Sequence, residues 1–459
     1  MEAFADIVAS VEYYNRDEGE IKTVSAEAVG DTVTTWGEGS DDTNPKWYVV
    51  KEAVTINDRI TVTGNVHLIL ADNAKLQAKQ GIDVSKGNSL TIYAQRDMVT
   101  ENTGKIEAEI NGKNAGIGGS ENKEGGIIKI TGGKVKVKSQ NGAGIGGGYE
   151  GAGGNIEITG GDVKARSRFG AGIGGGSDGT GGSIKITGGE VDANSNDSGA
   201  GIGGGAYAAG GNIEITGGDV KATSLSGAGI GGGRGGDGGS IKITGGKVYA
   251  SSAPNAGAGI GAGEGGAAGS FSTGPDGKAT IKANRGISDT SNEENWKGII
   301  FQKNRGKVYG EQELSYDFDI GGGHILEIPS GGKLTIPQGK TLGLNHGTKL
   351  QNNGTLENNG KIKKRKGSEI IGSDPTGSGE LIDKPYSTPT AAIDYRAEKL
   401  TGLSADISYL ITFDINREDI DKPADGETGI KEQWLGKTLS IMAKEDDSFL
   451  ESPEQRLPI

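Results

Sequence analysis

Two motifs recur in step through the middle of the sequence, and they limit the fold more than any other feature does. Ile-Thr-Gly-Gly places its threonine at positions 131, 159, 187, 216 and 244, at intervals of 28 or 29 residues. Ala-Gly-Ile-Gly-Gly, written Ala-Gly-Ile-Gly-Ala in its last copy, places its isoleucine at 117, 145, 173, 202, 230 and 260. A fixed period of this length is the signature of a repeat architecture.

Each repeat predicts three short strands. Residues 154–158 alternate polar and apolar side chains, which is typical of a half-buried strand. Val163 and Ala165 continue the alternation after a Gly-Gly bend, a polar turn follows over residues 166–169, and Ile173 stands alone in a third segment. Three strands separated by turns describe one coil of a solenoid, whose apolar side chains become buried only when coils stack.

Stacking would align equivalent side chains into ladders. We predict three buried ladders: Ile158, Ile186, Ile215 and Ile243; Val163, Val191, Val220 and Val248; and Ile145, Ile173, Ile202 and Ile230. We predict one outward ladder in which the charge alternates: Lys129, Glu157, Lys185, Glu214 and Lys242. Opposite charges on neighbouring strands stabilise by roughly 0.2–1 kcal/mol. The alternation therefore indicates the register of the coils and a repeating unit of two coils.

The flanking segments predict an all-β chain with three parts. Residues 1–46 form an N-terminal cap or an added strand. Residues 47–380 form a parallel β-helix, or solenoid, whose Gly-rich repeats span about 112–274. We expect it to be right-handed, as parallel crossovers are. Residues 385–459 have less glycine and alternate like the strands of a small Ig-like or fibronectin-like β-sandwich.

Composition excludes several classes of function. With no cysteine, the chain has neither disulfides nor thiolate metal sites. A net charge of −13 opposes an electrostatic grip on nucleic acid. No run of apolar residues is long enough to span a membrane, and the N-terminus lacks the pattern of a signal peptide. We expect the chain to be a segment of a longer protein.

Several stretches resemble large surface proteins of Gram-positive gut anaerobes. They are residues 47–50 (Trp-Tyr-Val-Val), 60–70 and the Gly-Ala-Gly-Ile-Gly-Gly-Gly repeats. Residues 400–403, 434–441 and 452–455 are similar to the tandem sandwich modules that follow such β-helices. The resemblance implies a secreted, adhesin-like protein attached to the cell wall through regions outside this chain. It also implies a host partner, either a glycoprotein such as immunoglobulin or mucin, or a glycan.

Catalytic and metal-binding patterns are sparse. His67, His324 and His346 lie far apart and without metal-ligand spacing. The Gly runs precede strands, whereas a phosphate loop precedes a helix. Asp178 and Asp237 stand outside any tandem calcium-binding nonapeptide, which leaves structural calcium open. We expect no cofactor, no metal and no enzymatic activity. The alternative is a polysaccharide lyase or glycoside hydrolase, because parallel β-helices also host such enzymes with clustered carboxylates.

The loop that follows each Gly-Gly-Gly is the predicted ligand-binding site. Coils that are otherwise near copies differ most there, and variable loops on a rigid scaffold commonly carry binding. The candidate residues are Tyr149, Glu150, Asp178, Tyr207, Arg234 and Asp237. The two tyrosines would lie two coils apart, about 10 Å at the strand spacing, and could stack on sugar rings. The alternative is a spacer rod, or stalk, whose loops bind nothing.

Overall fold

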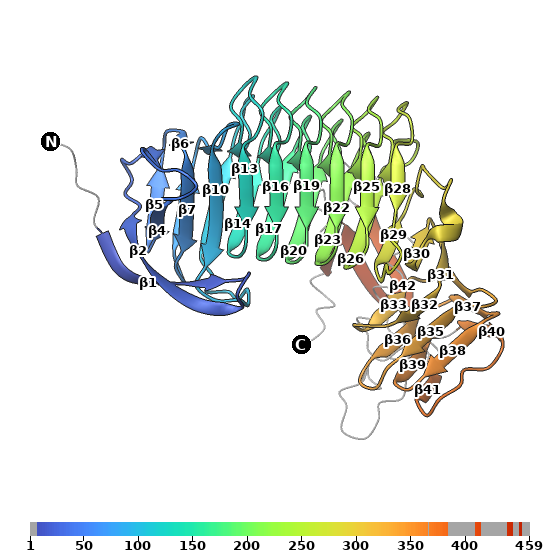
Figure 1. The fold of residues 1–459 in the computed structure, drawn as a ribbon. Helices are drawn as coiled ribbons and strands as arrows, with labels where there is room; N and C mark the ends of the chain where they lie inside the picture. The colour runs from blue at the N-terminus through green and yellow to red at the C-terminus, as the bar shows by residue number, and fades with distance from the viewer. Residues whose placement is uncertain (1–6, 366, 384–408, 415–437, 444–448, 452–459) are drawn as a thin grey trace. The chain divides into compact units, whose positions relative to one another are not determined.

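The fold was obtained as a computed structural model, which describes residues 7–365, 367–383, 409–414, 438–443 and 449–451 (Figure 1). The chain divides into two compact units, Met1–Lys303 and Asn304–Ile459. Both consist of β-strands, and the helical structure in the described residues is one 3₁₀ turn, η1 (Glu293–Asn295). The all-β prediction is confirmed.

Unit 1 contains three sheets, and each coil from β3 to β29 contributes one strand to each sheet. We name them sheets A, B and C. Sheet A contains β1 (Ile7–Asn15), β2 (Glu20–Ala28), β4 (Lys46–Val50), β7 (Asn65–Leu70), β10 (Ser89–Ala94), β13 (Ile127–Ile130), β16 (Asn155–Ile158), β19 (Ser183–Ile186), β22 (Asn212–Ile215), β25 (Ser240–Ile243) and β28 (Ser270–Ser272). Sheet B contains β3 (Thr35–Trp36), β6 (Ile60–Val62), β9 (Ile82–Asp83), β12 (Ile117–Gly118), β15 (Ile145–Gly146), β18 (Ile173–Gly174), β21 (Ile202–Gly203), β24 (Ile230–Gly231) and β27 (Ile260–Gly261).

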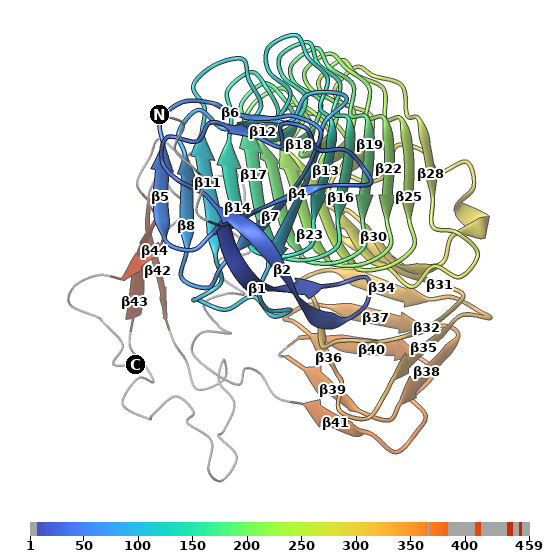
Figure 2. The ribbon, with the colours of Figure 1, turned by 60° about the vertical axis from the view of Figure 1, so that its left-hand side comes forward.

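Sheet C forms the third side of unit 1. Its strands here are β5 (Ala53–Ile56), β8 (Lys75–Ala78), β11 (Lys105–Glu109), β14 (Lys134–Lys138), β17 (Asp162–Ser167), β20 (Glu190–Ser195), β23 (Asp219–Ser224), β26 (Lys247–Ser252), β29 (Thr280–Ala283) and β30 (Gly298–Gln302). From β4 onward the strands pair in parallel, and Figure 2 shows the coils stacked side by side. Unit 1 is therefore a parallel β-helix.

The register agrees with the predicted ladders. Ile158 pairs with Ile186, Val163 with Val191 and Ile173 with Ile202, and all six side chains are buried. On the outer face of sheet A, Lys129 pairs with Glu157, Glu157 with Lys185, and Lys185 with Glu214. The alternating charge ladder is confirmed, and two of its steps are ion pairs: Lys129–Glu157 at 3.6 Å and Lys242–Glu214 at 3.1 Å.

Glycine is required where coils approach most closely. In sheet B, Gly174 has φ +134°, and a Cβ added there would lie 2.0 Å from the carbonyl oxygen of Gly203 in the next coil. Equivalent glycines at 118, 146, 203 and 231 share this conformation. Side chains rarely adopt such angles, and a methyl group would separate the coils. The Ala-Gly-Ile-Gly motif therefore reflects the packing of backbone against backbone.

The predicted turn over residues 166–169 is wrong at its start. Strand β17 continues to Ser167, whose buried Oγ donates a hydrogen bond to the Gly142 carbonyl at 2.7 Å. Ser195, Ser224 and Ser252 make the same contact in later coils. A serine can point inward here because each hydroxyl finds a carbonyl partner. The corner is a buried serine ladder, which polarity alone does not distinguish from a surface turn.

Unit 2 contains further parallel strands, which pair in three rows. One contains β31 (Arg305–Tyr309), β34 (Ile325–Ile328), β37 (Lys349–Asn352) and β40 (Glu369–Gly372). A second contains β32 (Glu311–Glu313), β35 (Lys333–Ile336) and β38 (Thr355–Asn358), and a third contains β33 (Phe318–Ile320), β36 (Thr341–Leu344), β39 (Lys361–Lys364) and β41 (Glu380–Asp383). These pairings are parallel.

The predicted sandwich over residues 385–459 lies mostly outside the described residues. Three strands are described there: β42 (Tyr409–Asp414), β43 (Thr438–Ala443) and β44 (Phe449–Glu451), which pair antiparallel. Antiparallel sheets occur in many kinds of all-β domain. The Ig-like or fibronectin-like fold of this region therefore stays a prediction.

Candidate functional site

The loops between sheet B and sheet A form a regular array (Figure 1). In the second half of each loop, one backbone N–H donates to the carbonyl of the next coil, as Glu150 does to Ser177 at 2.8 Å and Asp178 to Ala206 at 2.9 Å. These bonds group the loop residues into columns. Loop column 1 contains Glu121, Tyr149, Ser177, Ala206, Arg234 and Glu264, and loop column 2 contains Asn122, Glu150, Asp178, Tyr207 and Gly235.

All six predicted site residues lie in this array, but the expected tyrosine pair does not form. Tyr149 is in loop column 1 and Tyr207 in loop column 2, because the fourth loop reads Ala206-Tyr207 where the second reads Tyr149-Glu150. The two rings therefore do not repeat along one line at twice the strand spacing. Asp237 belongs to a third column, and its carboxylate accepts the N–H of Ala267 at 2.8 Å. Counting residues from the Gly run would have found this offset.

Loop column 2 requires a left-handed backbone. Glu150, Asp178 and Tyr207 have φ of 61°, 63° and 60°, and Gly235 has φ 75°. Asparagine, aspartate and glycine tolerate this conformation, whereas a bulky aromatic residue there is an outlier. Tyr207 is nevertheless 66% exposed, so burial of its ring does not compensate for the strain. Retained strain at an exposed side chain is a feature of functional positions.

Charged partners surround the column residues. Lys113 places its Nζ 4.9 Å from the centre of the Tyr149 ring, a cation–π distance. Arg234 forms an ion pair with Glu264 of the next coil at 3.2 Å. The pKa of Tyr149 is raised, first by the charge of Glu150 and then by that of Asp178. The array thus presents aromatic, acidic and basic groups on one repeated backbone.

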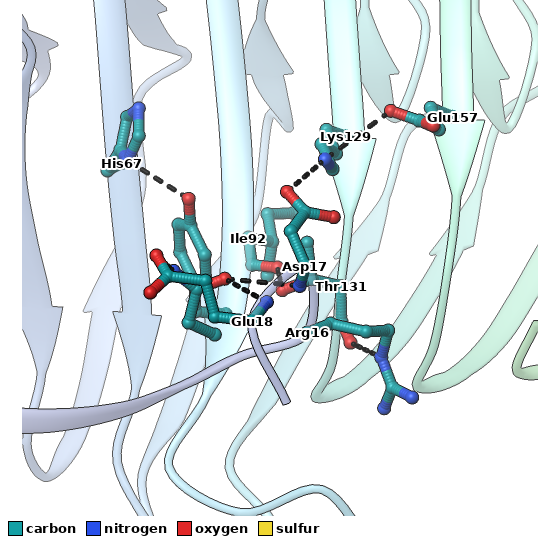
Figure 3. Close-up of polar contacts among 10 residues, drawn as sticks. Arg16, Asp17, Glu18, His67, Ile92, Lys129, Thr131 and Glu157 are labelled. Carbon is teal, nitrogen blue, oxygen red and sulfur yellow. Dashed lines mark hydrogen bonds and ion pairs between the residues drawn. The ribbon is translucent and has the colours of Figure 1, made fainter. Parts of the chain in front are cut away.

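An N-terminal hairpin covers the first coils of sheet A. Strands β1 and β2 pair antiparallel, β2 pairs with β4, and Tyr13 of β1 packs on Trp47 and Tyr93 at ring distances of 4.8 and 5.0 Å. At the hairpin tip, Arg16 donates to the Thr131 carbonyl at 3.0 Å (Figure 3). Asp17 reaches Lys129 at 3.0 Å and so joins the charge ladder, as Figure 3 also shows. The sequence did not predict this position for the hairpin.

His67 lies beneath the hairpin and is not in a metal cluster. Burial, and secondarily the charge of Lys129, lowers its pKa to about 4. Its Nδ1 lies 3.2 Å from the Tyr93 hydroxyl, which fits a neutral imidazole that accepts a hydrogen bond. Within the described ranges, no group of three or more His, Asp and Glu side chains is placed to hold a metal ion. The same residues include no helix with the length and hydropathy of a membrane span.

Comparison with known families bears on the fold. A family profile described as Beta helix repeat matches residues 128–149, 156–177, 184–206, 213–234 and 241–264. These segments cover the coils from β13 to β27. Searches among curated proteins and among solved structures returned no match. The chain therefore contains beta helix repeats, in agreement with the parallel stacking of unit 1.

Proposed function

We propose that this chain is the non-catalytic, ligand-binding β-helix segment of a bacterial cell-surface, adhesin-type protein. Its loop columns 1 and 2 bind a host glycoprotein, such as immunoglobulin or mucin, or a host glycan. The segment is extracellular and is attached to the cell wall through regions outside this chain. The match to beta helix repeats supports the scaffold in this proposal, and the loop array supports the binding role.

The observation that carries the proposal is the contrast between a constant backbone and varied side chains. Successive loops repeat the same hydrogen bonds and the same left-handed residue, while loop column 1 changes from Tyr149 to Ser177 to Ala206 to Arg234. A strained tyrosine at position 207 has no structural benefit that its contacts explain. Constant scaffold and variable outward groups are typical of repeat proteins that bind through one surface.

Two carboxylates of the coils have the pKa shift of ion-pair partners. A glycoside-cleaving acid needs a pKa raised by an apolar setting. Glu107 instead has a lowered pKa, mainly through its hydrogen bond with Lys75, and Glu357 has a lowered pKa through Lys333. The chemistry of these two acids favours ion pairing over proton donation.

A capture experiment with the full chain tests the proposal. The immobilised chain should retain glycoproteins from mucus or serum, and Tyr149→Ala with Tyr207→Ala should reduce the retained amount at least about fivefold, since two exposed aromatic anchors are lost. Leu225→Ala removes another exposed apolar side chain, at 55% exposure and outside the loop columns, and should leave capture unchanged. Equal capture by the double variant, or turnover of acidic polysaccharides by the chain, would contradict the proposal.

A further inference from the structure

The outer face of sheet C breaks the charge rule that sheet A follows. Lys136 of β14 pairs directly with Lys164 of β17, and Lys138 pairs with Arg166. Like charges on adjacent strands destabilise a sheet. Sheet A instead alternates the sign of its outward charges. Like charges also stack in the neighbouring outward column of sheet C, where Lys75, Lys105 and Lys134 are followed by Asp162, Glu190 and Asp219. Sheet C thus gathers like charges into patches, and Lys136, Lys138, Lys164 and Arg166 form one patch of cations.

The four cations line a depression of about 150 Å³ together with Gln77, Glu107 and Glu109. Two of them have acidic partners: Lys138 lies 2.7 Å from Glu109, and Lys164 lies 3.0 Å from Asp162. Lys136 and Arg166 are exposed and make no ion pair within 4.0 Å in the part of the chain that the structure describes. Lys136 also lies beside Glu107 on the next strand, so the depression sets four cations against two carboxylates and keeps an excess of positive charge for an anion from outside the chain.

The geometry of the depression suits a group with several anionic oxygens. Parallel strands place Lys136 and Lys164 about 4.8 Å apart, and residues two apart on one strand lie about 6.6 Å apart. A sulfate or carboxylate between them would meet both lysine Nζ atoms and the guanidinium of Arg166. Arginine forms charge-assisted, bidentate hydrogen bonds with such groups.

Neutral polar and aromatic side chains continue from the depression along the same face. Arg166 pairs with Asn194, Asn194 with Thr223, and Thr223 with Ser251, so amide and hydroxyl groups follow the cations coil by coil. Tyr249 of β26 is 38% exposed on this face. It lies three strands beyond Lys164, or about 14 Å at the strand spacing, with Asp192 and Lys221 between them in the same column. Amides, hydroxyls and one exposed aromatic ring are the groups that contact sugars.

A densely charged polyanion fits this face poorly. Asp162, Glu190 and Asp219 stack in the neighbouring outward column, and the whole chain carries a net charge of −13. Nucleic acid, with its uniform phosphate charge, would meet these acids as it followed the face. A glycan that carries isolated acidic substituents would place one of them in the depression and neutral rings elsewhere.

We propose that the outer face of sheet C binds an acidic oligosaccharide. Its sulfate or carboxylate group occupies the depression formed by Lys136, Lys138, Lys164 and Arg166, and a sugar ring further along stacks on Tyr249. This site is separate from the loop columns, so it stands or falls independently of the function proposed for them.

Titration calorimetry on the full chain tests this site with three probes of equal length. They are a sulfated oligosaccharide, an oligouronate that carries carboxylates only, and a neutral oligosaccharide. We expect at least one acidic probe to bind about tenfold or more tightly than the neutral one, and the tighter acidic probe identifies the anionic group. Equal affinity for all three probes, or no binding of either acidic probe, overturns the proposal.

Variants locate the site. Lys136→Gln with Arg166→Gln should weaken the acidic probe about tenfold or more, because contacts to charged groups are among the stronger hydrogen bonds. Its melting temperature should change little, since relief of the Lys136–Lys164 and Lys138–Arg166 repulsion offsets the loss of the Lys136–Glu107 attraction. Lys185→Gln with Lys242→Gln removes the same charge from sheet A and should change the affinity less than about twofold. Equal loss of affinity in both double variants, or tighter binding of a DNA duplex than of either acidic probe, contradicts an acidic-glycan site.

Discussion

At the scale of single residues, the informative positions are those where the local conformation and the side chain disagree. Tyr207 occupies a left-handed position that other coils fill with Asn122, Glu150, Asp178 or Gly235. His67 is a titratable group buried beneath a hairpin. Each feature gives a measurable consequence.

Replacing Tyr207 by asparagine should stabilise the protein. Asparagine tolerates the left-handed region, so we expect the free energy of unfolding to rise by about 0.5–1 kcal/mol. Urea denaturation of Tyr207→Asn measures this change. Tyr149→Asn provides the comparison, because Tyr149 belongs to the column without positive φ and should gain nothing. A less stable Tyr207→Asn would show that the ring makes packing contacts important to the fold.

His67 should make stability depend on pH. Its folded pKa is about 4, below the ordinary value of 6.5, so the unfolded chain binds the proton more tightly. Stability is therefore fully present above pH 6.5 and declines as the pH falls toward 4. In His67→Gln this part of the decline should be absent, while the decline caused by carboxylates remains. Melting temperatures of both proteins between pH 7 and pH 4 test the difference, and parallel curves would refute it.

At the scale of elements, the hairpin and the ladders make separate contributions. The hairpin is held by the aromatic cluster of Tyr13, Trp47 and Tyr93 and by the polar contacts of its tip. The ladders fix one coil over the next. A change in the hairpin should therefore remain local, whereas a change in a ladder should affect the whole of unit 1.

Tyr13→Ala should release the hairpin and leave the coils folded. Tyr13 is nearly buried, and removing a packed aromatic side chain costs about 3–5 kcal/mol where no repacking occurs. Hydrogen exchange should accelerate at the amides of β1 and β2 but not at those of β16 to β25. Tyr14→Ala, on the opposite face of the same strand, should change exchange much less. Uniform acceleration throughout unit 1 would mean that the hairpin and the coils unfold together.

Charge reversal within the sheet A ladder should destabilise the stack. Lys185→Glu places three acids in succession with Glu157 and Glu214, which should cost roughly 1 kcal/mol at low salt and less at high salt. Lys136→Glu on sheet C exchanges one attraction for one repulsion, because its neighbours are Glu107 and Lys164, and should cost little. Equal effects of the two reversals in thermal unfolding would contradict a register role for the ladder.

At the scale of the whole molecule, the features that could be predicted from the sequence are those that repeat with its period. The isoleucine and valine ladders and the Lys–Glu alternation follow from a fixed spacing, because residues one period apart must stack in a parallel solenoid. The buried serine ladder could not be predicted from the period alone. Ser167 is buried because a carbonyl of the preceding coil accepts the hydrogen bond of its hydroxyl. The position of the hairpin could not be predicted either. The hairpin lies in a segment without repeats, and its contacts join residues far apart in the sequence, such as Arg16 and Thr131.

The candidate site, too, could be predicted from the sequence only in part. Variation among near-identical repeats located the loops, but the column of each residue depends on hydrogen bonds between coils, which separated Tyr149 from Tyr207. The basic depression of sheet C depends on which strands lie side by side. Lys136 and Lys164 lie a full period apart and are unremarkable in the sequence alone.

The central claim, that outward charge sets the register of a parallel stack, can be tested by removing coils. Deleting residues 183–211 removes one coil and places Glu157 over Glu214 and Lys164 over Lys221. Deleting residues 183–239 removes two coils and places Glu157 over Lys242 and Asp162 over Lys247. Thermal unfolding of both variants across a range of salt concentrations gives the measurement.

The melting temperature of the one-coil deletion variant should rise with salt, because salt screens its like-charged contacts. The melting temperature of the two-coil deletion variant should fall or stay constant, because salt screens its ion pairs. The same salt response in both deletions would show that charge does not set the register of the stack.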